Sequence, residues 1–161
     1  MREDRLLKGA ALLEADAANP EGVKFDLGTW VSPSGSHRFE SGYPTDTQSV
    51  EVNCGTTACG WGLMAISGIF KDEGVGFKIF GGSSAEPGML LPSYGDYTGM
   101  EAAANFFEIG TVMAARLFDT PTYRKLEGAK AELFVAQRMR YLAANGDLPL
   151  SALASMGGYD H

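Results

Sequence analysis

Apolar residues recur at helical spacing near the beginning of the chain. Four of them fall on one stripe, with charged residues between them: Leu6, Ala10, Leu13 and Ala17. This pattern predicts an amphipathic helix from Asp4 to Ala18. Asn19-Pro20 should end it, because the residue before a proline is pushed out of the helical region.

Two further apolar segments predict the centre of the fold. The segment Thr56 to Phe70 predicts a buried helix. It contains Gly60, Gly62 and Gly68, and glycine weakens an exposed helix by about 1 kcal/mol relative to alanine, so another backbone should pack closely there. The segment Leu126 to Ala144 has a broad apolar arc, which is typical of a helix that lies between other elements. We expect these two helices to pack against each other.

Local signals mark the ends of other helices. Thr98 and Glu101 have the spacing of a capping box, in which each side chain bonds a backbone N–H of the other residue. A helix should therefore run from there to about Phe107. A second short helix is expected from Thr111 to Phe118. Asn145-Gly146 should end the last long helix in a left-handed conformation.

Stretches rich in Gly, Pro and Ser separate the helical segments. Residues 20–53 and 71–99 are loop-rich, and connections of this length are pinned to the core or form part of a working surface. Within the second stretch, residues 76–80 alternate like a strand and can pair with residues 89–91. The tail over 157–161 is expected to be frayed.

Together these elements predict a single globular domain over 1–161, since a chain of 161 residues can bury one good core. The predicted fold class is α+β, mostly α. It has about five helices around a central buried helix, a small β-hairpin and long surface loops.

Composition then narrows the function classes. The chain carries 20 acidic and 13 basic side chains, a formal net charge of −7, which argues against a surface built to bind nucleic-acid backbones. Its apolar runs are shorter than the roughly 20 residues of a membrane span, and its N-terminus lacks the apolar core of a secretion signal. We expect a soluble, cytoplasmic protein. Its two cysteines are too few for a disulfide framework.

Both cysteines lie in the segment that is richest in residues typical of turns and helix caps, Asn53-Cys54-Gly55-Thr56-Thr57-Ala58-Cys59-Gly60-Trp61-Gly62. It is typical of a loop that turns into a helix, with a threonine as cap and Cys59 in the first turn. A helix N-terminus stabilises a thiolate and offers free amides to an anion. We therefore predict capture of a polar or anionic ligand at this turn. The candidate binding residues are Asn53, Cys54, Thr56, Thr57 and Cys59, with His37 and Trp61 as neighbours. The alternative is an architectural turn in which both cysteines are small buried hydrophobic residues.

Three segments carry motifs that occur together in one protein family. The first reads Phe25-Asp26-Leu27-Gly28-Thr29-Trp30, the second runs from Cys54 to Gly62, and the third covers 105–118. They resemble a family of small, uncharacterised bacterial and phage proteins. That family combines Phe-x-Met-x-x-Trp with Cys-Gly-Thr-x-x-Cys-x-x-Gly and a later Phe-Phe-Gly-Leu and Leu-Phe region. Members often carry histidine after the last glycine, where this chain has Leu63. The family has no assigned reaction, and the resemblance implies a partner in a host pathway such as defence.

Cysteine chemistry is one alternative function. A cysteine-dependent enzyme using Cys54 or Cys59 would need a base, but His37 lies upstream in a loop and His161 is the last residue. A redox pair of the two cysteines would have four intervening residues where two are usual. Two thiols and one distant histidine leave a zinc shell incomplete, so no metal or cofactor is expected.

A DNA-binding regulator is the other alternative. Residues 104–117 loosely match a helix-turn-helix, and residues 111–140 hold six basic against three acidic side chains. Arg116 is, however, the single basic residue on the recognition helix of that hypothesis. The leading hypothesis is a binding or interaction protein without catalytic activity, whose partner is a host protein or a small polar or anionic ligand. Loops on a helical scaffold and tyrosine side chains are typical of recognition surfaces.

Overall fold

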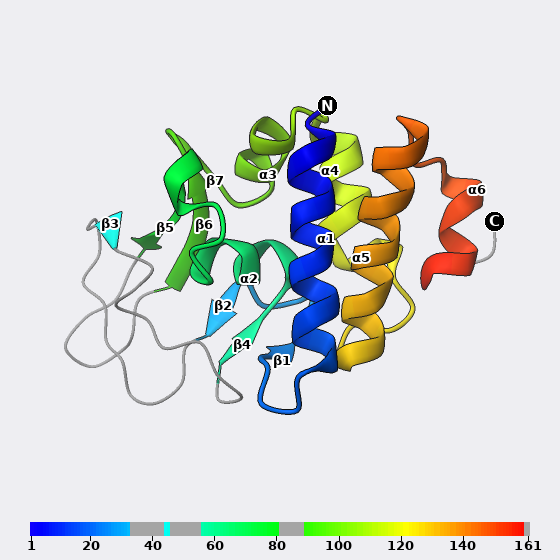
Figure 1. The fold of residues 1–161 in the computed structure, drawn as a ribbon, viewed down its shortest axis with the longest axis horizontal. Coiled ribbons are helices and arrows are strands. Elements are labelled where there is room, and N and C mark those ends of the chain that lie inside the picture. Colours follow the sequence, from blue (N-terminus) through cyan, green and yellow to red (C-terminus); the bar gives the residue numbers. More distant parts are fainter. Residues whose placement is uncertain (33–43, 46–55, 81–88, 160–161) are drawn as a thin grey trace.

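The computed structural model describes residues 1–32, 44–45, 56–80 and 89–159. In these ranges the fold is α+β and mostly α, with six α-helices and two small sheets. Figure 1 shows two long helices, α1 and α5, side by side, with the larger sheet on the other side of α2. The predicted fold class is confirmed. Within the part of the chain that is described, no helix is long and apolar enough to cross a membrane.

The two long helices are α1, Glu3–Ala18, and α5, Gly128–Asn145. They run antiparallel, so the C-terminal end of α1 lies beside the N-terminal end of α5 (Figure 1). A Cβ on Gly9 of α1 would lie 2.8 Å from the Met139 methyl carbon and 2.9 Å from the Met64 sulfur, so glycine permits this close approach. The main packing partner of α5 is α1. The predicted contact between α5 and the central helix is local: a Cβ on Gly60 would lie 3.2 Å from Val135 Cγ1 of α5.

The larger sheet contains the predicted hairpin. β5, Val75–Phe80, pairs antiparallel with β6, Met89–Tyr94. Two-residue strands extend it on both sides, β3 at Pro44–Thr45 and β7 at Tyr97–Thr98, in the order β3-β5-β6-β7. The hairpin prediction is confirmed, with longer strands than the sequence indicated.

The smaller sheet joins segments that are far apart in the chain. β4, Thr57–Ala58, lies between β1, Lys24–Phe25, and β2, Val31–Ser32. It pairs parallel with β1 and antiparallel with β2. These pairings hold the segment that precedes the central helix between residues 24–25 and 31–32.

The central helix α2, Gly60–Ile66, is buried along its whole length. It is shorter than the predicted helix over 56–70, because Thr57–Ala58 are engaged as a strand on both sides. Trp61 is at its start, and its Nε1 donates to the Gly99 carbonyl at 3.0 Å. Three phenylalanine rings lie 5.6 to 6.3 Å from the Trp61 ring: Phe106, Phe107 and Phe118. Trp61 is therefore a core residue.

Two short helices follow the sheet as predicted, α3 at Gly99–Phe107 and α4 at Thr111–Phe118. Thr98 is the N-cap of α3, but its side chain makes no capping hydrogen bond, so the predicted capping box does not form. Glu108 ends α3 in the left-handed conformation, with φ of 54°. The reversal of chain direction between α3 and α4 thus depends on the left-handed backbone conformation of Glu108.

Short elements complete the C-terminal half. Gly146 ends α5 with φ of 75°, as predicted. The α6 helix spans Leu150–Leu153, and single 3-10 turns occur at Lys71–Glu73, Thr120–Thr122 and Ala154–Met156.

The C-terminal segment is packed against the fold as far as residue 158. Gly157 and Gly158 are buried. The Gly158 N–H donates to the Leu153 carbonyl at 2.7 Å, and the Arg124 N–H donates to the Gly157 carbonyl at 2.8 Å. The prediction of a frayed tail over 157–161 is therefore wrong for its first residues, while 160–161 lie outside the described ranges.

A buried arginine ties this segment to α4 and α5. The Arg138 guanidinium has no exposed surface and stacks 3.4 Å from the Tyr123 ring. It donates to the carbonyls of Met156 (3.0 Å), Arg116 (2.7 Å) and Thr122 (2.7 Å). Such a planar fork of donors can serve several acceptors at once.

Candidate functional site

The structure places the predicted ligand-binding turn partly in the core. Thr56, Cys59 and Trp61 are buried, and Thr57 is half-buried. Asn53, Cys54 and His37 lie outside the described residues. The residues of the motif that are described are therefore not gathered at a surface.

Cys59 is the N-cap of α2 and does not lie in its first turn. Its Sγ accepts a hydrogen bond from the Gly62 N–H at 3.3 Å, and its own N–H donates to the Thr29 carbonyl at 2.7 Å. Burial raises the pKa of this thiol to about 12, which outweighs the hydrogen bond from Gly62. The expectation of a stabilised thiolate is wrong for Cys59. It is a free, buried thiol, unsuited to nucleophilic chemistry.

The surroundings of Gly62 explain why the motif has a glycine at this position. A Cβ at this position would lie 1.7 Å from the Trp30 carbonyl oxygen, a distance that no substituted residue can adopt. The predicted close approach of another backbone is thus confirmed here. The described part of the motif brings α2 and the Trp30 backbone together, which favours the architectural alternative.

The contacts of the C-terminal arginines weigh against the DNA-binding alternative. Arg116 donates to the Leu148 carbonyl at 2.8 Å, and Arg138 is buried. Arg140 forms an ion pair with Glu14. Arg124 donates to the Ala154 carbonyl at 3.4 Å, so four of the six basic side chains of residues 111–140 are engaged within the fold.

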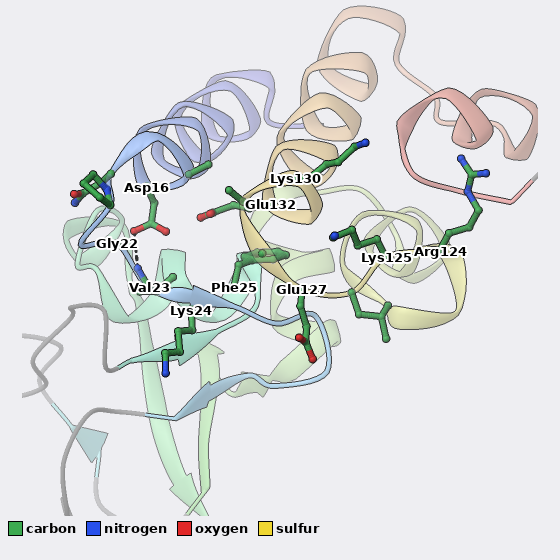
Figure 2. A pocket seen from close by; sticks show the side chains of 16 residues that line it. Asp16, Gly22, Val23, Lys24, Phe25, Arg124, Lys125, Glu127, Lys130 and Glu132 are labelled. Atoms are coloured by element: carbon green, nitrogen blue, oxygen red, sulfur yellow. Dashed lines mark hydrogen bonds between the residues drawn. The ribbon is translucent and has the colours of Figure 1, made fainter.

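A different feature stands out as a candidate site. A pocket of about 950 Å³ lies where the C-terminal end of α1 meets the N-terminal end of α5 (Figure 2). We call it the α1–α5 pocket. Its lining comes from the end of α1, residues 19–25, residues 124–127 and the first turns of α5.

Two carboxyl side chains face each other at the wall of this pocket. Asp16 projects from α1 and Glu132 from α5, and Figure 2 shows them pointing toward one another. Glu132 is 1% exposed, whereas Asp16 is half-buried. Asp16 Oδ2 and Glu132 Oε1 are both buried and receive no hydrogen bond from any group that the structure describes. We call these residues the carboxyl pair.

The carboxyl pair holds a proton at neutral pH. Burial, and secondly the adjacent Asp16 carboxyl, raise the pKa of Glu132 to about 9.

The turn after α1 holds the Asp16 carboxyl in place. The Asn19 N–H donates to the Asp16 carbonyl at 3.0 Å, and the Val23 N–H donates to Asp16 Oδ1 at 3.2 Å. A Cβ on Gly22 would lie 2.6 Å from the Asp16 carbonyl oxygen and 2.8 Å from Oδ1. Glycine at this position therefore lets the turn close over Asp16.

Four exposed cationic side chains also line the pocket, and we call them the basic rim: Lys24, Arg124, Lys125 and Lys130. In Figure 2 Lys125 extends toward α5, whereas Lys24, Arg124 and Lys130 extend outward. The N-cap of α5 is Glu127, whose side chain makes no capping hydrogen bond. The amides of the first turn of α5 therefore have no side-chain cap, and they lie at the positive end of the helix dipole.

Sequence reasoning missed this site. The apolar stripe that predicts the first helix leaves Asp16 on its solvent side, and Glu132 is one of the three acidic side chains in the charge balance of residues 111–140. One signal was available: Glu132 stands three residues before Val135 and four before Ala136, on the buried face of α5. An acidic residue at a core position indicates either a buried partner or a site.

No group of three or more His, Cys, Asp or Glu side chains could hold a metal ion within the described ranges. Comparison with known proteins finds no matching family model, no similar curated protein and no solved structure with a matching fold.

Proposed function

We propose that the chain is a binding protein that holds a small polar ligand with an anionic group in the α1–α5 pocket. The observation that carries the proposal is the buried carboxyl pair at the wall of a pocket of about 950 Å³. This volume lies within the range of small-molecule sites. Burying two carboxyls without an outside donor is costly, and such groups gather at functional sites.

The charges at the start of α5 support an anionic group on the ligand. Lys130 lies in the first turn of α5, and Arg124 and Lys125 precede it. Positive side chains at the positive end of a helix dipole destabilise the helix, and an anion bound there compensates both charges. The basic rim and the uncapped amides of α5 are therefore suited to one anionic group.

The resemblance to bacterial and phage proteins supports a wider proposal. We place the protein in the cytoplasm, where its ligand or a host protein would belong to a host pathway such as defence. The α1–α5 pocket gives this proposal a definite surface to examine.

Amide NMR spectra can test the proposed site with inorganic phosphate as the probe. We expect millimolar phosphate to shift the amide signals of residues 127–131 at pH 7. Ala129→Trp, which fills the pocket, should weaken this response, while Ala144→Trp at the other end of α5 should leave it unchanged. The proposal is overturned if these signals do not move, or if both variants respond as the unmodified protein does.

A further inference from the structure

We propose that the carboxyl pair binds a primary ammonium group. The ligand of the α1–α5 pocket is then a small molecule with an ammonium group at one end and an anionic group at the other. The inference rests on the proposed function and deepens it, because it names the chemical class of the ligand of the same pocket.

The first argument is that the carboxyl pair lacks a counter-ion. Neither Asp16 nor Glu132 forms an ion pair with a lysine or arginine of the described ranges. Of the cationic side chains that line the pocket, Lys24, Arg124 and Lys130 extend away from the pair in Figure 2, and Lys125 extends toward α5. A negative charge thus stays beside a pocket whose rim is positive.

The second argument is the match of donors to acceptors. The carboxyl pair presents two buried oxygens without a partner, Asp16 Oδ2 and Glu132 Oε1. A primary ammonium group has three N–H donors and can give one to each oxygen, in charge-assisted hydrogen bonds. A sulfonate or ether oxygen has no donor to give.

The third argument is charge balance. With a proton on Glu132 the carboxyl pair carries a charge of −1. When an ammonium group enters, that proton leaves to the solvent, both carboxyls are ionised, and the charge of pair plus ammonium is again −1. The bound state therefore buries no additional net charge, which is the condition for a buried ion pair to form at modest cost.

The fourth argument is the separation of charges in the pocket. Lys125, on the segment before α5, extends toward that helix, and Glu127 stands at its N-cap. An anionic group near Lys125 and the α5 amides lies apart from an ammonium group at the carboxyl pair. A simple anion leaves the pair without a partner and a simple amine leaves the basic rim without one, whereas an amino acid-like molecule serves both.

Calorimetric titration can test this assignment with probes whose anionic end does not titrate. The probes are 2-aminoethanesulfonate and 3-aminopropanesulfonate, each compared with the alkanesulfonate that lacks the amine and with 2-hydroxyethanesulfonate. We expect at least one amino compound to bind about tenfold or more tightly than its amine-free counterpart. At pH 7, two buffers of different ionisation enthalpy should report release of about one proton for each ligand bound.

Glu132→Gln separates the pair's role from general effects on the fold. Glutamine cannot ionise, so the preference for the amine and the proton release should both disappear. Glu14→Gln, an exposed site on α1 outside the pocket, should retain both.

Three results would overturn the inference. One is equal binding of amino and amine-free probes, and another is binding of 2-hydroxyethanesulfonate as tight as that of its amino analogue. The third is Mg²⁺ binding that releases the proton more effectively than the amines do, which would make the pair a metal site. A failed phosphate titration rejects the anion site itself, so the two proposals fail separately.

Discussion

Glu132→Gln should make the protein more stable at neutral and alkaline pH. In the unfolded chain the Glu132 carboxyl has its ordinary pKa of 4.5 and is ionised at pH 7, whereas burial and the Asp16 carboxyl raise its pKa in the folded protein to about 9. The folded state therefore binds a proton that the unfolded state does not, and the stability contributed by this group is lost as pH rises from 4.5 toward 9. Glutamine has no proton to bind, and its amide can still donate to Asp16.

The size of the effect follows from the two pKa values. Each pKa unit corresponds to about 1.4 kcal/mol, so keeping Glu132 protonated at pH 7 costs the folded protein about 3 kcal/mol as an upper limit. At pH 5 the same cost is below about 1 kcal/mol. The free energy of unfolding of the unmodified protein should thus fall by up to about 1.4 kcal/mol for each pH unit in this window, relative to that of the variant.

Urea unfolding followed by circular dichroism at pH 5, 6, 7 and 8 measures this difference directly. We expect the curves of Glu132→Gln and the unmodified protein to coincide near pH 5 and to separate with rising pH. Glu14→Gln is the control, because that exposed carboxyl in a surface ion pair should change stability by less than about 1 kcal/mol without altering the pH slope. Parallel pH profiles for Glu132→Gln and the unmodified protein would refute the raised pKa of Glu132.

Three further substitutions or treatments test the core. Gly62→Ala should cost more than about 3 kcal/mol or prevent folding, because its Cβ would overlap the Trp30 carbonyl. Gly76→Ala, whose Cβ would make an ordinary contact with Ser93 Oγ at 3.9 Å, should cost about 1 kcal/mol or less, and urea midpoints compare the two. Cys59 should resist iodoacetamide in the native protein at pH 8 and react after denaturation, as read by peptide mass spectrometry, and rapid native alkylation would contradict its burial. Arg138→Met should lower stability by about 3 kcal/mol or more, seen in thermal unfolding, because it removes the donor of three buried or part-buried hydrogen bonds to carbonyls. A melting temperature unchanged by the substitution would show that these bonds contribute nothing net.

Elements whose signal is local were predictable from the sequence. The stripe at Leu6 and Leu13 specified α1, the alternation over 76–80 specified the hairpin, and Gly146 marked the end of α5. In each case the periodicity or the turn residue acts within a few positions of itself. The capping box at Thr98 failed although the helix start was right, because the spacing of two residues does not fix their rotamers.

The start of α2 was not predictable in the same way. Thr57–Ala58 become a strand because β1 and β2 pair with them, and that pairing depends on segments about thirty residues earlier in the chain. The same pairing places Cys59 at the N-cap of α2 and buries it, and this burial removes the reactivity expected of a thiol at a helix start. Tertiary contact therefore reversed the chemical interpretation of a motif whose local features were correctly identified.

The motif at Cys59 and the carboxyl pair differ in how the fold treats their polar groups. The polar groups of Cys59 are satisfied, because its thiol and its amide both have hydrogen-bond partners. At Gly62 the Trp30 carbonyl leaves no room for a side chain. The carboxyl pair is left with two buried oxygens that the described chain does not serve, at a cost that one conservative change to glutamine would remove. A residue that lowers stability where a better-suited residue is one substitution away is typical of a functional position. On this argument Glu132, rather than the conspicuous motif, is the residue around which a search for the ligand should be organised.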